Sequence, residues 1–396
     1  MMDRILVTAG YDHHIKFWNL AKGHLVLNIS HPEGQVNAMA LSPNSRHLAV
    51  AAWQKLRIYD INALYANRKT SDPIAVYDVS KNITSVGFEI HGRWMFAGGD
   101  DHYCRIFEIK ANQLVCQRSQ MFSAPITNIE LHGNQVELFI STNDGNVFVL
   151  DLRREVYDRM PMPLLEANEY VQKLTMHPGG IQLSAITNSG RLFTWDIKHR
   201  NLEHIVSPGI PVLPPAPQMT LSTGVIREGD EEPKKVQSGY GLSCRYSPCG
   251  RYLFTTGSDN KLHMFNATTL DLRFSLTSSC TWNWDAIYSN DGRHVFTGGD
   301  DCRVTMWETD TGKNMGRFTD HQKPITAIST ILNLNSVETA SPTRVKRRDI
   351  GILHGDGAST YVRTKRISRC NSETYPANRT KIEVVKMTDS RKVREL

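Results

Sequence analysis

Aspartate and histidine are the residues of this 396-residue chain whose type and spacing could do chemistry. A carboxylate beside an imidazole is half of a Ser–His–Asp triad, in which the carboxylate orients the histidine as a general base. His321 lies late in the chain, and five aspartates recur at one position of a repeated pattern: Asp12, Asp101, Asp144, Asp259 and Asp301. Their role depends on the elements that carry them.

The motifs of the common enzyme classes are absent from the sequence, which has no Walker loop, GxGxxG, HExxH or GxSxG. The seven cysteines are odd in number and include no CxxC pair, so reduced thiols are expected rather than a disulfide framework or a zinc ribbon. The histidines have no metal-ligand spacing. We therefore expect no enzyme, and no catalytic, cofactor-binding or metal-binding residues.

Composition places the chain among soluble globular proteins, with 40% hydrophobic and 22% charged residues. No apolar run approaches the roughly 18–20 residues that cross a bilayer, and the N-terminus has no signal-peptide pattern, so a cytoplasmic protein is expected. Residues 340–396 carry 14 Lys and Arg against 6 Asp and Glu, a net charge of +8, so residues 1–339 carry a net −2. The basic character belongs to the tail.

The aspartates lie in a repeated segment. Each copy is a strand ending near a glycine, a turn carrying the aspartate, and an alternating strand that ends on an aromatic residue. The clearest copies are VTAGYDHHIKFW (7–18), FAGGDDHYCRIF (96–107), FTTGSDNKLHMF (254–265) and FTGGDDCRVTMW (296–307). With three less regular copies, the last positions are 18, 59, 107, 150, 195, 265 and 307. Apart from one longer gap, this spacing is near the ~40–45 residues of a propeller blade.

Seven such units predict an all-β, seven-bladed β-propeller of WD repeats over residues 1–335. The chain begins on the second strand of a blade, so residues 325–331 are expected to complete that first blade and close the ring. His321 would then meet Thr8, Asp12 and Trp18 in a buried hydrogen-bonded brace. The five repeated aspartates are accordingly interpreted as structural, and so are Trp195 and Trp307.

Two segments depart from the repeat. Residues 205–238 contain Pro-Gly-Ile-Pro-Val-Leu-Pro-Pro-Ala-Pro and are interpreted as a long exposed loop, with an SH3 or WW ligand as the alternative. Residues 336–396 form the basic tail, for which disorder is predicted. A solvated extension, a contact with nucleic acid or acidic membrane, nuclear import, and phosphorylation at Ser368 remain open for the tail, although no nucleic acid is expected as a partner.

Several strings resemble the G-protein-β-like WD-repeat subunit of target-of-rapamycin (TOR) kinase complexes. They are VTAGYDHHIKFW, QVNAMALSP, KNITSVGF, GRWMFAGGDDHYCRIF and GRFTDHQKPIT. The resemblance runs from about residue 5 to residue 332 and is weakest at Tyr157–Glu169, while the Pro-rich segment and the tail depart from it. It implies a non-catalytic subunit of TOR complexes 1 and 2 that docks on the kinase domain and stabilises the active kinase in nutrient and growth signalling. It also implies raptor-type and rictor-type scaffolds as partners, and recruitment with the complex to lysosomal or other endomembrane surfaces.

A partner surface follows from the repeat itself. The aspartate turns and the loops that enter each inner strand open on one side of a propeller, and binding residues concentrate on loops held by a rigid scaffold. Trp282 and Trp284 are expected to form one aromatic patch there, although packing of one between blades is the alternative; for Trp94, core packing is favoured. The predicted partner contacts are Gln35, Asn37, Trp53, Asn82, Asn128, Tyr240, Trp282 and Trp284.

The alternative function is a substrate-recruiting WD-repeat adaptor of another assembly, such as a ubiquitin ligase, because propellers have many unrelated roles. Such an adaptor should keep its partners when Trp282 and Trp284 are altered. It should lose them when the tail or the Pro-rich loop is removed.

Overall fold

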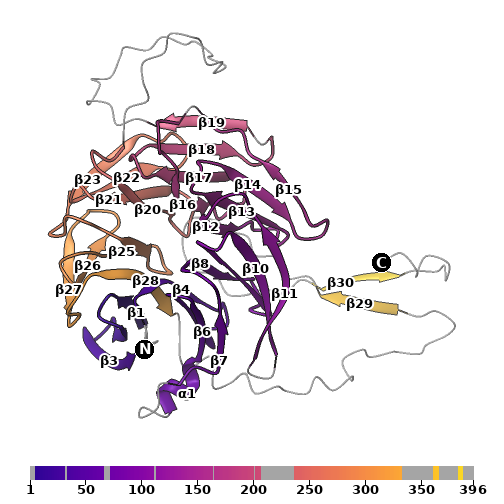
Figure 1. Ribbon diagram of the computed structural model, residues 1–396, viewed down its shortest axis with the longest axis horizontal. Helices are drawn as coiled ribbons and strands as arrows, with labels where there is room; N and C mark the ends of the chain where they lie inside the picture. The colour runs from indigo at the N-terminus through magenta and orange to yellow at the C-terminus, as the bar shows by residue number, and fades with distance from the viewer. Residues whose placement is uncertain are drawn as a thin grey trace, which may run out of the picture. The chain divides into compact units, whose positions relative to one another are not determined.

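In the residues that it describes, the computed structural model has seven four-stranded antiparallel sheets, which we number as blades 1 to 7, a two-stranded sheet and one short helix (Figure 1). It describes residues 5–31, 34–66, 72–110, 113–163, 165–199, 201–206, 236–331, 360–364 and 382–386. The chain divides into two compact units, Met1–Thr339 and Ala340–Leu396. Within the described residues, no helix is long and apolar enough to cross a membrane.

Each blade runs from an innermost to an outermost strand. Blade 1 consists of β28 (Ile325–Ile331), β1 (Ile5–Gly10), β2 (His14–Asn19) and β3 (His24–Ser30). Blade 2 consists of β4 (Val36–Leu41), β5 (His47–Ala52), β6 (Lys55–Asp60) and β7 (Ala75–Asp78). Blade 3 consists of β8 (Ile83–Phe88), β9 (Trp94–Gly99), β10 (Tyr103–Lys110) and β11 (Gln113–Met121). Blade 4 consists of β12 (Ile126–Leu131), β13 (Glu137–Thr142), β14 (Val147–Asp151) and β15 (Val156–Arg159). Blade 5 consists of β16 (Val171–Met176), β17 (Gln182–Thr187), β18 (Leu192–Asp196) and β19 (Asn201–Val206). Blade 6 consists of β20 (Gly241–Tyr246), β21 (Tyr252–Gly257), β22 (Lys261–Asn266) and β23 (Leu272–Thr277). Blade 7 consists of β24 (Asp285–Tyr288), β25 (His294–Gly298), β26 (Arg303–Glu308) and β27 (Asn314–Thr319).

The predicted closure is confirmed. β28 pairs antiparallel with β1, with Val7 opposite Ser329, so the first blade joins the two ends of the repeat region. The innermost strands contact one another in sequence from β4 to β24, and β28 contacts both β24 and β4. The second strands of the blades are nearly all buried, because both of their faces pack against neighbouring sheets. The ring is therefore held by layers of apolar side chains between blades.

Inner-strand side chains also join successive blades by hydrogen bonds. Thr84 Oγ1 donates to the carbonyl of Ile126 at 2.7 Å, and Thr127 Oγ1 donates to the carbonyl of Val171 at 2.6 Å. At the same register position Thr326 donates to the Val36 carbonyl and Asn37 to the Ile83 carbonyl. The junctions from blade 1 to blade 5 are thus linked in one pattern.

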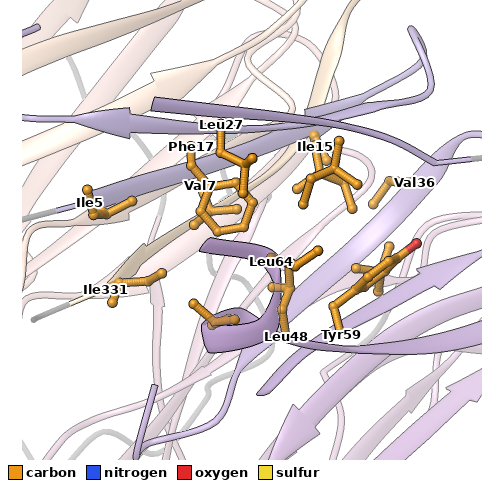
Figure 2. Close-up of a cluster of buried hydrophobic side chains, with 14 of the residues drawn as sticks. Ile5, Val7, Ile15, Phe17, Leu27, Val36, Leu48, Tyr59, Leu64 and Ile331 are labelled. Carbon is orange, nitrogen blue, oxygen red and sulfur yellow. The ribbon is translucent and has the colours of Figure 1, made fainter. Parts of the chain in front are cut away.

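The longer spacing between the repeats that end at Tyr59 and Phe107 accommodates helix α1 (Ile61–Ala66), which the repeat pattern did not predict. Leu64 of α1 is 3% exposed and belongs to the apolar cluster between blades 1 and 2. Figure 2 shows Leu64 near Phe17 and Val7. The extra residues therefore add to the core as well as connecting two strands.

The Pro-rich segment is shorter than predicted at both ends. Residues 205–206 belong to β19, and Val236 and Gln237 are 2% and 0% exposed. Gln237 Nε2 donates to Thr255 Oγ1 at 3.0 Å, which explains why this end packs into blade 6. Residues 207–235, with the proposed SH3 or WW ligand, lie outside the described residues.

In the second unit, β29 (Thr360–Thr364) and β30 (Ile382–Lys386) pair antiparallel, with Val362 opposite Val384. The rest of the basic tail, including Ser368, lies outside the described residues. Disorder of the tail therefore stays a prediction.

Blade 1 contains a buried chain of four side chains. His321 Nδ1 donates to Asp12 Oδ2 at 2.7 Å, and His321 Nε2 lies 2.8 Å from Thr8 Oγ1. Trp18 Nε1 donates to the same Thr8 oxygen at 2.8 Å. Thr8, Trp18 and His321 are at most 5% exposed. The structure thus brings these residues together as a brace, and the Thr8 oxygen is its central atom.

Replacing Thr8 with Val keeps the shape of the side chain and removes that central oxygen. We expect Thr8→Val to lower the free energy of unfolding by about 1–3 kcal/mol, because a buried donor loses its partner. Urea unfolding at constant m-value measures the loss. Thr319→Val is the matched control, since Thr319 is exposed on β27. An equal loss in both variants would contradict a brace.

The brace also predicts a dependence on pH. Burial opposes ionisation of Asp12, but the hydrogen bond and charge of His321, with the N–H groups of Gln322 and His14, lower its pKa from 3.8 to about 2. A carboxyl group whose pKa falls on folding stabilises the protein above its unfolded pKa, and this contribution is lost as pH falls from about 4 to 2.

We expect the stability difference between wild type and Asp12→Asn to narrow as pH falls through this range. Chemical unfolding of both proteins at pH 5, 4 and 3 measures it. A difference that stays constant would show that ionisation of Asp12 does not contribute.

Candidate partner-binding face

The repeated aspartates connect two elements on one face of the ring. In each case one carboxylate oxygen accepts the N–H of the residue two positions later, as in Asp301 with Arg303 at 3.1 Å. The other oxygen of Asp301 accepts Ser279 Oγ at 2.8 Å, and Asp259 and Asp144 accept Ser238 and Ser123 in the same way. These serines lie in the loops that lead into the inner strands. We call this arrangement the turn–loop clamp, and the face on which the turns and loops open the top face.

The repeated glycine allows the clamp to close. A Cβ on Gly299 would lie 2.1 Å from the carbonyl oxygen of Trp282, and one on Gly257 would lie 2.5 Å from that of Tyr240. Because no side chain intervenes, Asp300 N–H donates to the Trp282 carbonyl at 3.1 Å and Ser258 N–H to the Tyr240 carbonyl at 2.9 Å. The glycine and aspartate of the repeat therefore fix the backbone of two predicted partner contacts.

Histidine hydrogen-bonds to the turn aspartate in blade 1, and in blade 6 His263 Nε2 lies 4.0 Å from Asp259 Oδ2. In blade 3 the second oxygen of Asp101 lies 2.6 Å from Arg105. In blade 5 the hydroxyl and the carboxylate of the clamp exchange places. Ser189 occupies the turn and donates to the carboxylate of Glu169, which lies in the loop. Glu169 also forms an ion pair with Arg191. Glu169 and Arg191 are 5% and 2% exposed, so this pair replaces the aspartate that the sequence lacks.

Blade 2 has no turn aspartate, and Trp53 in that position is 55% exposed. The loop is held instead by His31, a residue that the sequence analysis missed. Its Nδ1 lies 3.0 Å from the Tyr59 hydroxyl and its Nε2 lies 3.0 Å from an Arg57 nitrogen. Burial raises the pKa of Tyr59 to about 12, so this hydroxyl stays protonated. Because the brace does not use Trp53, its indole is free to face solvent on the top face.

Four aromatic rings form a continuous row across blades 6, 7 and 1. Tyr240 stacks on Trp282 with ring centroids 5.5 Å apart, and Trp282 stacks on Trp284 at 5.3 Å. Tyr11, which the sequence analysis missed because it precedes Asp12 in the turn, extends the row at 6.5 Å from Trp284. We call these residues the aromatic row. Tyr240 is 54% exposed and the other three are partly exposed.

Amide side chains lie together on blades 2 and 3. Gln35 Nε2 donates to Asn37 Oδ1 at 3.3 Å, and Asn37 Nδ2 donates to Asn82 Oδ1. Asn82 in turn bonds Asp100, whose pKa is raised because burial outweighs that hydrogen bond. We call Gln35, Asn37 and Asn82 the amide row. Polar groups of this kind orient a partner rather than supply binding energy.

Asn128 was wrongly predicted as a partner contact. It lies within β12 rather than in the loop before it, and it is 3% exposed. Its Nδ2 donates to Ser85 Oγ at 3.3 Å and its Oδ1 accepts the Leu174 N–H at 3.0 Å, so both amide atoms are used between blades. Trp94 is partly buried and packs against the cluster of blades 3 and 4, whereas Trp18, Trp195 and Trp307 are at most 7% exposed.

The top face has the composition of a recognition surface. Large aromatic side chains on a rigid support give binding energy at low entropic cost, and the neighbouring amides give direction. Among the residues that the structure describes, no group of three His, Cys, Asp or Glu could hold a metal ion.

Comparison with known proteins agrees with this architecture. A model of the WD domain, G-beta repeat, matches residues 23–60, 71–108, 232–266 and 277–308. The mouse target of rapamycin complex subunit LST8 is 30% identical over 82% of this chain and 94% of its own length. The Drosophila melanogaster LST8 homolog is 31% identical over 82% of this chain and 95% of its own length. The chain belongs to the LST8 family.

Two further relatives match over a smaller part of the chain. The bovine LST8 subunit is 40% identical over 38% of this chain and 45% of its own length, and the fission yeast TOR complex subunit wat1 is 30% identical over 37% and 45%. Blades 4 and 5 of this LST8-family chain lie outside the four matched repeats. Blade 5, where the clamp is reversed, is thus among the blades that the repeat model does not match.

The reversed clamp can be tested through its buried ion pair. We expect Arg191→Met to lower the free energy of unfolding by roughly 3–5 kcal/mol, because it leaves the Glu169 carboxylate buried and unpaired. Arg153→Met is the control, since Arg153 forms an exposed ion pair with Asp151 and should change little. The double variant Arg191→Met/Glu169→Met should regain part of the loss, because neither charge then remains. Urea unfolding of the four proteins gives the comparison, and a double variant no more stable than Arg191→Met would contradict the coupling.

Proposed function

We propose that this protein is a non-catalytic subunit of TOR complexes 1 and 2 that docks through its top face on the TOR kinase domain and stabilises the active kinase. The observation that carries the proposal is the aromatic row, a set of partly exposed stacked rings held by the clamp. Membership of the LST8 family supports the choice of partner, since its relatives are named as subunits of the target of rapamycin complex.

The physical role follows from the support beneath the rings. Interface hot spots are enriched in Trp and Tyr, and truncating one commonly costs about 2 kcal/mol or more. Stacking already limits the rotamers of Trp282 and Trp284, so little further entropy is lost when a partner covers them. A closed propeller leaves only the short outer edges of its blades unpaired, so its top face offers the kinase a rigid surface of turns and loops.

The proposal includes the raptor-type and rictor-type scaffolds as further partners within the two complexes. It also includes a cytoplasmic location and recruitment with the complex to lysosomal or other endomembrane surfaces. Co-fractionation of the tagged protein with each scaffold tests the first part, and imaging of it with lysosomal markers tests the second.

The docking face is tested by affinity purification from native cells with quantitative mass spectrometry. We expect wild type to recover TOR kinase and Trp282→Ala/Trp284→Ala to lose most of it, by tenfold or more if the two rings act as hot spots. Ile181→Ala is the matched control, because Ile181 is 57% exposed in a turn on the opposite face. Cooperative melting of each variant is checked first.

The outcomes separate the docking face from the function. Kinase recovered equally by wild type and the double variant would move the contact away from the aromatic row. Absence of kinase from every sample would overturn the TOR assignment. Partners that survive the double variant but are lost on deletion of residues 207–235 or 340–396 would favour the adaptor alternative.

A further inference from the structure

The propeller encloses a central channel whose two halves differ in chemistry. It has a volume of about 810 Å³ and is lined by the innermost strands. Blades 1 to 3 contribute small residues such as Ala38 and Ser85, larger apolar residues such as Met39, and one charged residue, Asp100. Blades 4 to 7 contribute one charged side chain each, Glu130 from β12, Lys173 from β16, Arg245 from β20 and Asp285 from β24. The small residues leave room opposite the charged wall.

The two acidic side chains of this wall already have donors within the protein. Glu130 Oε1 accepts the N–H of Met176 at 3.2 Å. Asp285 Oδ1 accepts Ser243 Oγ at 3.2 Å, and Asp285 Oδ2 accepts the N–H of Ile328 at 3.0 Å. These bonds hold both carboxylates against the inner strands, where they join neighbouring blades.

The two basic side chains have an excess of donors. The Nε of Arg245 is buried and has no hydrogen-bond partner among the described residues. Neither Lys173 nor Arg245 lies within 4.0 Å of a carboxylate oxygen in the ion pairs found for the described part of the chain. Because a guanidinium carries five N–H groups and an ammonium three, the wall presents more donors than its acids accept.

Charge interactions show that these groups share one environment. Burial raises the pKa of Glu130 despite the nearby positive charges of Arg245 and Lys173. Burial also lowers the pKa of Lys173, and the like charge of Arg245 adds to the effect. The charges of Glu130, Lys173 and Arg245 therefore act on one another across the channel.

We propose that Lys173 and Arg245 form a binding site in the channel for a phosphate-bearing anion, either inorganic phosphate and pyrophosphate or the phosphate group of a small metabolite. A planar guanidinium binds two phosphate oxygens at once, and an ammonium adds a point charge. The volume lies within the roughly 300–1,000 Å³ of small-molecule sites. Tyr11 and Trp284 of the aromatic row also line this cavity, but the proposed site uses only Lys173 and Arg245 and does not rest on the function proposed above.

Isothermal titration calorimetry of the purified full chain with inorganic phosphate and with pyrophosphate tests the site. We expect Arg245→Gln and Lys173→Met to weaken binding about tenfold or more, as loss of a charged hydrogen bond does. Arg154→Gln, which removes an exposed cation away from the channel, should bind like wild type. Organic phosphates of increasing size then show whether the ligand is the free anion or a metabolite.

The variant Glu130→Gln makes the test independent of folding defects. The amide oxygen can still accept the Met176 N–H, but the negative charge next to the site is removed. We expect it to bind pyrophosphate several-fold more tightly than wild type, the direction that a misfolded protein would not give. Absence of binding to wild type at millimolar anion, or equal affinities for wild type, Arg245→Gln and Glu130→Gln, would overturn the site.

Discussion

The geometry of the top face depends on one contact, the turn–loop clamp. In this contact a glycine without a side chain lets a turn N–H reach the carbonyl of the preceding loop, and the turn aspartate binds a side chain of the same loop. A methyl group on Gly299 would lie 2.1 Å from the Trp282 carbonyl oxygen, so the contact tolerates no other residue without movement of the backbone. The glycine and aspartate that recur in each repeat therefore also position the loop residues that differ between repeats, such as Trp282.

The ring is uniform in its backbone but not in its inner-strand side chains. From blade 1 to blade 4, the second inner-strand position bonds the next blade through Thr326, Asn37, Thr84 or Thr127. In blade 7 the corresponding position is Trp284, which packs in the aromatic row instead. Four of the five charged residues that line the channel also belong to blades 4 to 7, and the fifth, Asp100, belongs to blade 3. The inner strands of blades 1 to 4 thus use this position to bond the next blade. Blades 4 to 7 carry three of the four rings of the aromatic row and most of the charged channel residues.

The fold could be predicted from the sequence because each blade repeats its own turn chemistry at a nearly fixed spacing, and because residues 325–331 have the length and alternation of a missing strand. The brace of His321, Thr8, Asp12 and Trp18 followed from that closure. The same reasoning failed where a blade changes its bonding: His31 and Glu169 replace the repeated partners at other positions, so no spacing reveals them. Asn128 was misplaced because the loop before β12 and the third residue of β12 are only a few residues apart in sequence. The register of β12 with β13, which the sequence does not reveal, shows that Asn128 belongs to the strand.

The aromatic row could be predicted as far as the alternation of Trp282 and Trp284, but not in its full extent. Tyr240 and Tyr11 come from blades 6 and 1, and only ring closure places them at the two ends of the pair. Stacking covers part of each ring, which reduces the apolar area that an unbound propeller exposes and restricts the rotamers before a partner arrives. Pairing of β28 with β1, which closes the ring, therefore also creates a binding surface that is continuous in space and discontinuous in sequence. A partner that binds all four rings therefore binds only the closed ring, because in an open ring Tyr11 would be separated from Trp284.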